Sequence, residues 1–177
     1  LQYYSGMRGF TKLPKNYFDK YSDKPVKIIP FNPRAKIVAD KYINKLRLTL
    51  NKFNVEILLK GSTAYGIAGK GEIEIGVYPS EKEWEKVIAT LKIHFGRIDN
   101  LEENYARFND KFDDFEIEVI LLKGYDAAVD KKLTEYLINS PEVLKEYEKL
   151  KRRYSYSKRE YMIQKNSFLE KIVNKLR

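Results

Sequence analysis

The sequence predicts an α+β fold in which helices pack on a small mixed β-sheet and a helical segment follows at the C-terminal end. Three observations support this prediction. Short β-type runs occupy residues 55–60, 72–78 and 115–122, apolar residues at helical spacing lie between them, and from about residue 125 the patterns are helical. The length of 177 residues fits a single domain.

The composition excludes several classes of protein. Hydrophobic residues make up 43% of the chain, too many for disorder, yet no stretch approaches the roughly 20 apolar residues that span a bilayer. Cysteine is absent and His94 is the single histidine, so disulfides, thiol nucleophiles and zinc fingers are excluded and any metal must be held by oxygen. We expect a soluble, cytoplasmic protein without a membrane partner. The first residues lack an initiator methionine and an apolar signal core, so we expect the numbering to begin inside a longer chain.

The charge of the chain is strongly basic. Lys and Arg total 34 against 25 Asp and Glu, a net charge of +9 that favours phosphate-bearing partners. Residues 141–177 hold 11 basic and 5 acidic residues, so most of the excess lies in the C-terminal third. A solvated helix face is the more common explanation of such a run. The alternative is a surface for an RNA, DNA or protein acceptor, for which Lys151, Arg152 and Arg153 beside the tyrosines of 154–157 are candidates.

The first half of the chain divides at glycines and prolines. Residues 1–34 show no helical or alternating period and are predicted to form an extended arm packed on a domain of residues 35–177. From Pro33 to about Asn54 the apolar spacing predicts an amphipathic helix. Two strands then flank a glycine-rich connection, the first ending before Gly61 and the second, 72–78, ending before Pro79.

The second half begins with a helix for which Ser80 is the expected N-cap. Its core stripe consists of Trp84, Val87, Ile88, Leu91 and Phe95. The segment 97–109 is ambiguous and has room for two short strands, whereas 115–122 alternates clearly and predicts a strand. Ser140 and Pro141 predict the start of a helix, and a last helix carries apolar residues from Tyr161 to Leu176.

The connection from Gly61 to Gly71 has features suited to phosphate. Gly61 lets the backbone approach a ligand closely, and Ser62 and Thr63 offer N–H and O–H donors where a helix begins. Lys70 is long enough to reach phosphates, although an exposed turn lysine is the more common case. These four residues are the candidate triphosphate ligands.

Two carboxylates follow this connection on one strand. Glu72 and Glu74 are two residues apart, so a strand places both on the same face. Magnesium prefers one or two carboxylates together with phosphates and water, and two such ions clamp an in-line phosphoryl displacement. A third acid is expected from 115–122, where Glu116 and Glu118 share a face and Glu118 is the first choice. Asp113 and Asp114, just before this strand, are predicted turn residues.

These motifs together resemble a known superfamily. Gly61-Ser62 followed by the acid pair is similar to the signature of the DNA polymerase beta-like nucleotidyltransferases, and the GrpB-like family fits more closely still. The match rests on short motifs across residues 26–177, which are Ile29 to Pro33, Gly61 to Ala64, Gly66 to Lys70, Ile73 to Ile75, Pro141-Glu142, Tyr147, Leu150-Lys151, Tyr161, Lys165 and Phe168.

The resemblance implies a nucleotidyltransferase fold and, in outline, magnesium-dependent transfer of a nucleoside monophosphate from a nucleoside triphosphate to a hydroxyl acceptor. The expected catalytic acids are Glu72, Glu74 and Glu118, with Glu116 as a further metal ligand. Two departures stand out, since a proline usual in the family after Gly-Ser-Thr-Ala-x is missing and glutamate replaces aspartate. The alternative hypothesis is therefore a catalytically faded module that binds a nucleotide, RNA or protein on the same fold.

Overall fold

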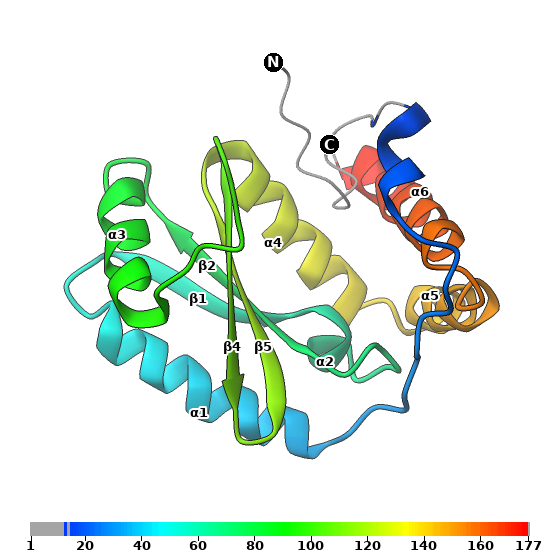
Figure 1. Ribbon diagram of the computed structural model, residues 1–177, viewed down its shortest axis with the longest axis horizontal. Helices are drawn as coiled ribbons and strands as arrows, with labels where there is room; N and C mark the ends of the chain where they lie inside the picture. The colour runs from blue at the N-terminus through cyan, green and yellow to red at the C-terminus, as the bar shows by residue number, and fades with distance from the viewer. Residues whose placement is uncertain (1–12, 14, 177) are drawn as a thin grey trace.

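The structure is a computed structural model that describes residue 13 and residues 15–176 (Figure 1). Residues 1–12 and 14 of the predicted arm therefore lie outside the described part. The elements in chain order are η1 (Lys15–Lys20), α1 (Arg34–Thr49), β1 (Val55–Lys60), α2 (Gly61–Tyr65), β2 (Ile73–Pro79), α3 (Trp84–Phe95), β3 (Asn100–Glu102), β4 (Tyr105–Phe112), β5 (Phe115–Leu122), α4 (Gly124–Ile138), α5 (Pro141–Arg153) and α6 (Lys158–Leu176).

The five strands form one mixed sheet in the order β1-β2-β5-β4-β3. Only β2 and β5 are parallel, and the other neighbours are antiparallel. The ambiguous segment 97–109 thus supplies β3 and most of β4, which form an edge hairpin. Asp113 and Asp114 connect β4 to β5 with positive φ angles of 49° and 68°, which confirms them as turn residues.

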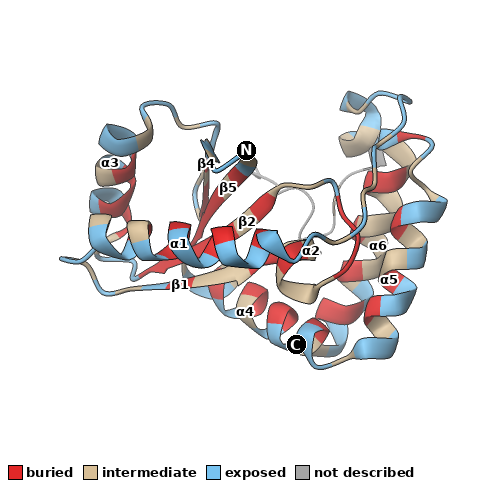
Figure 2. Cartoon of the chain, turned by 90° about the horizontal axis from the view of Figure 1, so that it is seen from below, coloured by how far each residue is buried: buried red, intermediate tan, exposed pale blue. Residues whose placement is uncertain are grey.

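Alternation along the strands separates the two faces of the sheet. Helices α1 and α3 cover one face, where the apolar partners of the alternating runs are buried, among them Ile73, Ile75, Ile117 and Val119 (Figures 1 and 2). The acidic positions between them point to the other face. That face is covered at one end by α4, which packs Ala127 against Tyr78, Ile120 and Leu122.

The C-terminal helices form a second body of packing beside the sheet. Apolar residues of α4, α5 and α6 bury one another, and Ile67 from the connection before β2 joins them. Figure 1 shows this helical part facing the open portion of the sheet. Within the described residues, no helix combines the length and the apolar character needed to cross a bilayer.

The described portion of the predicted arm is not entirely extended. Residues 15–20 form the 3₁₀-helix η1, which lies beside α6, and residues 21–33 continue without regular structure (Figure 1). Ile29 forms a two-way backbone bridge to Gly69, at 2.8 and 3.1 Å. This bridge joins the arm to the glycine-rich connection of the sheet.

Of the two expected helix caps, Ser140 is found in its predicted position and Ser80 is not. Helix α3 begins at Trp84 rather than directly after Ser80, whose hydroxyl donates to the Glu83 carboxylate at 3.1 Å. Ser140 does occupy the N-cap position of α5, but its side chain makes no capping hydrogen bond. Pro141 at the first helical position and Glu142 in the first turn favour this start instead.

Candidate active site

The parallel pairing of β2 and β5 brings the predicted carboxylates together. In the register of this pair, Glu74 is the direct partner of Glu118. Glu72 lies just before β2 on the same face, and one carboxylate oxygen from each of Glu72, Glu74 and Glu118 lies within 4.8 Å of the other two. We call these three residues the acidic cluster.

Glu116 does not join the acidic cluster. Its side chain is 63% exposed and pairs with Lys111 at 3.0 Å near the end of the β4–β5 hairpin. The sequence predicted that Glu116 and Glu118 share a face of β5. The strand register then places Glu118 beside Glu74 and Glu116 near the rim of the sheet. Among the residues that the structure describes, the third acid of the cluster is Glu118.

The connection after β1 lies directly against the acidic cluster. Gly61 has φ +67°, a conformation that favours glycine, and a Cβ there would lie 2.7 Å from Glu74 Cδ, so the Glu74 carboxylate would have to move. Ser62 follows in the first turn of α2 and lines the same cavity as Glu74. Thr63, the next residue of α2, is buried and does not line that cavity. Of the three predicted triphosphate ligands in this stretch, Gly61 and Ser62 therefore line the cavity and Thr63 does not.

Cationic side chains flank the acidic cluster. Lys70 pairs with Glu72, so this lysine contacts a carboxylate rather than the Gly61–Ser62 turn. Arg107 on β4 lies 3.9 Å from Glu118 and pairs with Asp99. A ligand of the acidic cluster must compete with or rearrange these ion pairs.

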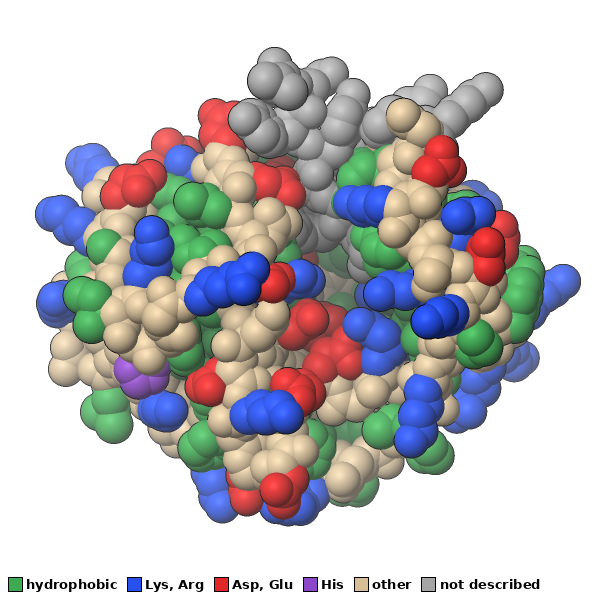
Figure 3. Space-filling model, in the orientation of Figure 1, with side chains coloured by type: hydrophobic (Ala, Val, Ile, Leu, Met, Phe, Trp, Pro, Cys, Tyr) green, Lys and Arg blue, Asp and Glu red, His purple; other side chains and the backbone are tan. Residues whose placement is uncertain are grey.

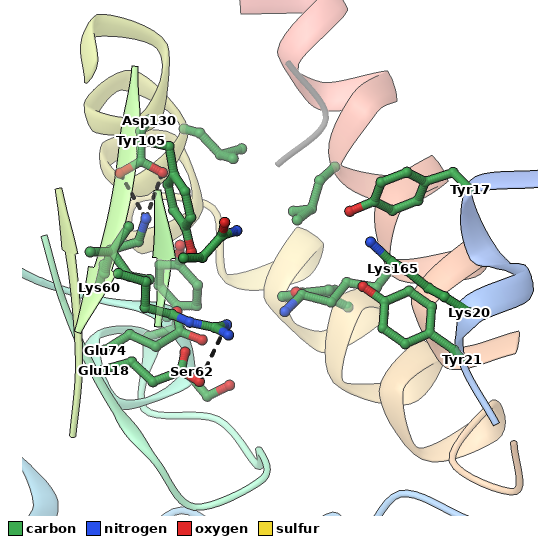
Figure 4. A pocket seen from close by; sticks show the side chains of 18 residues that line it. Tyr17, Lys20, Tyr21, Lys60, Ser62, Glu74, Tyr105, Glu118, Asp130 and Lys165 are labelled. Carbon is green, nitrogen blue, oxygen red and sulfur yellow. Dashed lines mark hydrogen bonds and ion pairs between the residues drawn. The ribbon is translucent and has the colours of Figure 1, made fainter. Parts of the chain in front are cut away.

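The helical part supplies the opposite wall of the cavity. The cavity has a volume of about 370 Å³, and Lys165 and Tyr147 line it from α6 and α5 (Figure 4). Lys151 lies behind Ser62 and donates to the Ser62 hydroxyl and to the Ala68 carbonyl, the latter at 2.7 Å. Figure 3 shows acidic and basic side chains meeting in this hollow between the two halves of the molecule.

A buried ion pair closes the inner end of the cavity. Lys60, the last residue of β1, donates to both carboxylate oxygens of Asp130 on α4, at 2.7 and 2.8 Å. The Tyr78 hydroxyl donates to the same carboxylate at 2.7 Å. Both charged side chains are less than 10% exposed, so the pair fastens α4 to the sheet next to Glu74.

The charges of the site perturb one another. Burial alone raises the pKa of Glu74, but Lys165, Lys60, Lys70 and Lys151 outweigh burial and the pKa is lowered. Burial and the Glu74 carboxylate raise the pKa of Glu118. Burial and the Lys165 ammonium lower the pKa of Lys151 to about 7. Two neighbouring carboxylates thus differ in proton affinity, as acids with separate roles do.

Several residues of the site, among them Lys151, Lys165 and Asp130, were not predicted to belong to it. Lys151 and Lys165 belong to the C-terminal motifs that resemble the GrpB-like family, and this was the signal that could have identified them. Lys151 had instead been grouped with Arg152 and Arg153 as a nucleic-acid surface, but it is 1% exposed and directed inward. Lys60 and Asp130 lie 70 residues apart and carry no motif that links them.

Comparisons with known proteins identify the family. A sequence profile described as GrpB protein matches residues 25–175. The crystal structure of the conserved protein GrpB from Enterococcus faecalis superposes with a TM-score of 0.68 at 18% identity, covering 84% of this chain and 96% of that one. No curated protein matches the sequence.

Two weaker likenesses are to larger chains. Cid1 in complex with its short product ApU has a TM-score of 0.49 at 13% identity, over 69% of this chain and 40% of that chain. The GLD-2/RNP-8 complex also has a TM-score of 0.49, at 16% identity, over 80% of this chain and 56% of that chain. The expected α+β fold, with its mixed sheet and helical C-terminal segment, is confirmed by the likeness to the GrpB crystal structure and by the sheet topology. The chain belongs to the GrpB family.

Proposed function

We propose that this protein binds a magnesium-bound nucleoside triphosphate and transfers its nucleotidyl group to a hydroxyl acceptor. The observation that carries this proposal is the convergence of Glu72, Glu74 and Glu118 from paired strands beside the Gly61–Ser62 turn. Three carboxylates next to a helix start and facing lysines form the combination that phosphoryl transfer requires.

The donor set of the acidic cluster fits magnesium. All three side chains offer oxygen, the ligand type that Mg²⁺ prefers. Burial and, after it, the neighbouring Glu74 carboxylate raise the pKa of Glu118, and a divalent cation would offset the second of these causes. Glu72, Glu74 and Glu118 would hold the metal, which when bound offsets the charge of the triphosphate and of the departing pyrophosphate. Glu116 lies too far toward the rim to share this role.

The triphosphate is bound between the two walls of the cavity. Ser62 provides its hydroxyl and backbone N–H at the start of α2, and Lys165 provides an ammonium from the opposite wall. Lys151 supports Ser62 from behind. Thr63 contributes at most its backbone N–H, because its side chain is buried. Lys70 acts on Glu72 and reaches phosphate only when that ion pair opens.

The reaction is an in-line displacement at the α-phosphate. The acceptor oxygen forms a bond to the α-phosphorus while the bond from that phosphorus to the bridging oxygen breaks, and pyrophosphate leaves with the electron pair. The carboxylate of the acidic cluster that lies beside the acceptor accepts the proton of the hydroxyl.

Transfer of the label from α-labelled nucleoside triphosphates to a panel of hydroxyl acceptors, together with release of unlabelled pyrophosphate, tests this function. Glu74→Gln is expected to lower the rate by at least about 100-fold, because it removes a charge from the centre of the acidic cluster. Glu116→Gln is the matched control, since it removes an exposed carboxylate of the same face and should leave the rate unchanged. Equal rates for wild type and Glu74→Gln would refute the proposed mechanism.

A binding module without turnover is the second candidate. It is favoured by the Lys70–Glu72 ion pair, which occupies one carboxylate, and by glutamates that are one methylene longer than aspartate. Such a module would present Arg152, Arg153 and Tyr156, which are exposed at the end of α5, to RNA. RNA binding that falls steeply with salt, without pyrophosphate release from any acceptor, would support the module over the enzyme.

A further inference from the structure

The N-terminal segment builds part of the cavity wall that faces the acidic cluster. Tyr17 and Lys20 of η1 line the cavity together with Tyr21, the next residue (Figure 4). In this view their side chains extend from the helical side toward Glu74 and Glu118, which lie on the sheet side. The cavity is therefore bounded by an acidic wall and an aromatic wall.

The aromatic wall is held in place by the backbone. Three hydrogen bonds connect residues 22–26 with residues 155–159, which run from the α5–α6 connection into the start of α6. They run from Val26 N to Ser155 O (2.7 Å), from Lys158 N to Lys24 O (2.8 Å) and from Arg159 N to Ser22 O (3.1 Å). Asp23 adds side-chain contacts, accepting from the Ser157 hydroxyl at 3.2 Å and pairing with Arg159 at 3.4 Å. Tyr21 is thus positioned directly before an anchored segment.

The chemistry of this wall suits a planar ring that is attached to phosphates. The Lys20 ammonium lies 3.8 Å from the centre of the Tyr17 ring and 5.3 Å from that of Tyr21. Tyrosine rings stack on the face of any nucleobase, and a neighbouring ammonium attracts the phosphates. A volume of about 370 Å³ lies within the range of small-molecule sites.

We propose that Tyr17 and Tyr21 form the nucleobase subsite of this cavity, so that a nucleoside triphosphate spans it from one wall to the other. Its triphosphate lies at Ser62 and the acidic cluster, and its base stacks on the tyrosine rings. This inference rests on the proposed function, because it takes the triphosphate position from that proposal. It adds a role for the N-terminal segment, whose aromatic residues would make affinity depend on the base.

Affinity for the base is separated from affinity for phosphate by comparing two ligands in the presence of Mg²⁺. The first is a non-hydrolysable nucleoside triphosphate, tried with each of the four bases, and the second is inorganic tripolyphosphate, which has no base. By calorimetry, the wild type is expected to bind at least one nucleotide about 10- to 100-fold more tightly than tripolyphosphate. The double variant Tyr17→Leu with Tyr21→Leu should lose this preference while binding tripolyphosphate as the wild type does.

Two controls distinguish stacking from other effects. Tyr17→Phe with Tyr21→Phe keeps both rings and should retain the preference for a nucleotide. Tyr125→Leu removes an exposed tyrosine outside the cavity and should change neither affinity. Unchanged tripolyphosphate binding also shows that the leucine variant is folded.

The outcomes separate this inference from the function on which it rests. If the wild type binds tripolyphosphate and nucleotides equally, or if the leucine variant keeps its preference for a nucleotide, the tyrosine subsite is wrong and the triphosphate site stands. The first comparison needs no variant, so it remains decisive even if the leucine variant does not fold. If the wild type binds neither ligand, the proposed function fails and the subsite fails with it.

Discussion

Glu74 and Glu118 are direct partners across the parallel strands β2 and β5, so two carboxylates project side by side from the centre of the sheet. Like charges placed opposite each other on neighbouring strands destabilise a sheet. Their pKa values move in opposite directions, downward for Glu74 and upward for Glu118. The pair therefore lowers the free energy of unfolding, and a bound cation would raise it again.

Glu118→Gln should stabilise the protein while removing metal binding. Because the pKa of Glu118 is raised in the folded state, the folded protein holds this proton more tightly than the unfolded chain does, and stability falls as pH rises from the usual value of 4.5 through the raised one. At pH 7 the variant should be more stable by about 0.5–1 kcal/mol, or about 1–4 °C in Tm.

Thermal unfolding with and without Mg²⁺ checks this prediction. Excess Mg²⁺ should raise the Tm of the wild type, because a ligand of the folded state stabilises it, and should leave Glu118→Gln unchanged. A variant that is less stable than the wild type at pH 7 would contradict the argument from charge crowding.

Gly61→Ala should displace Glu74 and abolish Mg²⁺ binding. The added Cβ would collide with the Glu74 carboxylate, and alanine would also be strained at φ +67°. Gly66→Ala is the matched control, because Gly66 has φ +68° but its Cβ would meet only Lys36 Nζ, at 4.0 Å. Both variants should lose about 1–2 kcal/mol to backbone strain. Only Gly61→Ala should lose Mg²⁺ binding in calorimetry, and equal metal affinity of the two variants would contradict this role.

Local sequence patterns were sufficient to predict the faces on which Glu72 and Glu74 lie. The alternation around Glu72 and Glu74 places apolar partners in the core and carboxylates on the opposite face, and a period of two needs no knowledge of neighbouring strands. The choice between Glu116 and Glu118 depends on the register in which β5 pairs with β2. That register is set by tertiary packing, and it places Glu118 beside Glu74.

The unpredicted parts are contacts over long chain separations. Lys60 meets Asp130 across 70 residues, and Lys151 meets Ser62 across 89 residues. A charged residue on an amphipathic helix is normally solvated, so sequence alone places Lys151 with its exposed neighbours of α5. The position of η1 beside α6 was also not predicted, because residues 1–34 carry no periodicity that indicates where they pack.

Asp130→Asn should destabilise the protein strongly. The substitution leaves the buried Lys60 ammonium without its counter-charge, and breaking a buried pair in this way costs about 3–5 kcal/mol. Lys131→Met removes the neighbouring pair with Glu56, whose side chains are 38% and 49% exposed, and should cost less than about 1 kcal/mol. Urea denaturation compares the two variants. A loss of similar size for both would mean that the Lys60–Asp130 pair is effectively solvated.

Lys151 should make stability increase with pH above neutrality. Its folded pKa of about 7 lies below the usual value of 10.5, so between these values the unfolded chain binds a proton that the folded protein does not. The free energy of unfolding therefore rises with pH across this window, and below pH 7 burial of the charged ammonium lowers it. Lys151→Met removes the titrating group, so its stability measured by urea denaturation from pH 6 to 9 should lack this rise.

The same lysine predicts a proton exchange on ligand binding. A triphosphate at Ser62 places negative charge beside Lys151, which raises its pKa and draws a proton from solution when binding occurs at pH 8. Calorimetry in buffers of different ionisation enthalpy should show an uptake of up to about one proton for the wild type and none for Lys151→Met. Identical uptake by both proteins would place the triphosphate away from Ser62, because no other change separates the two.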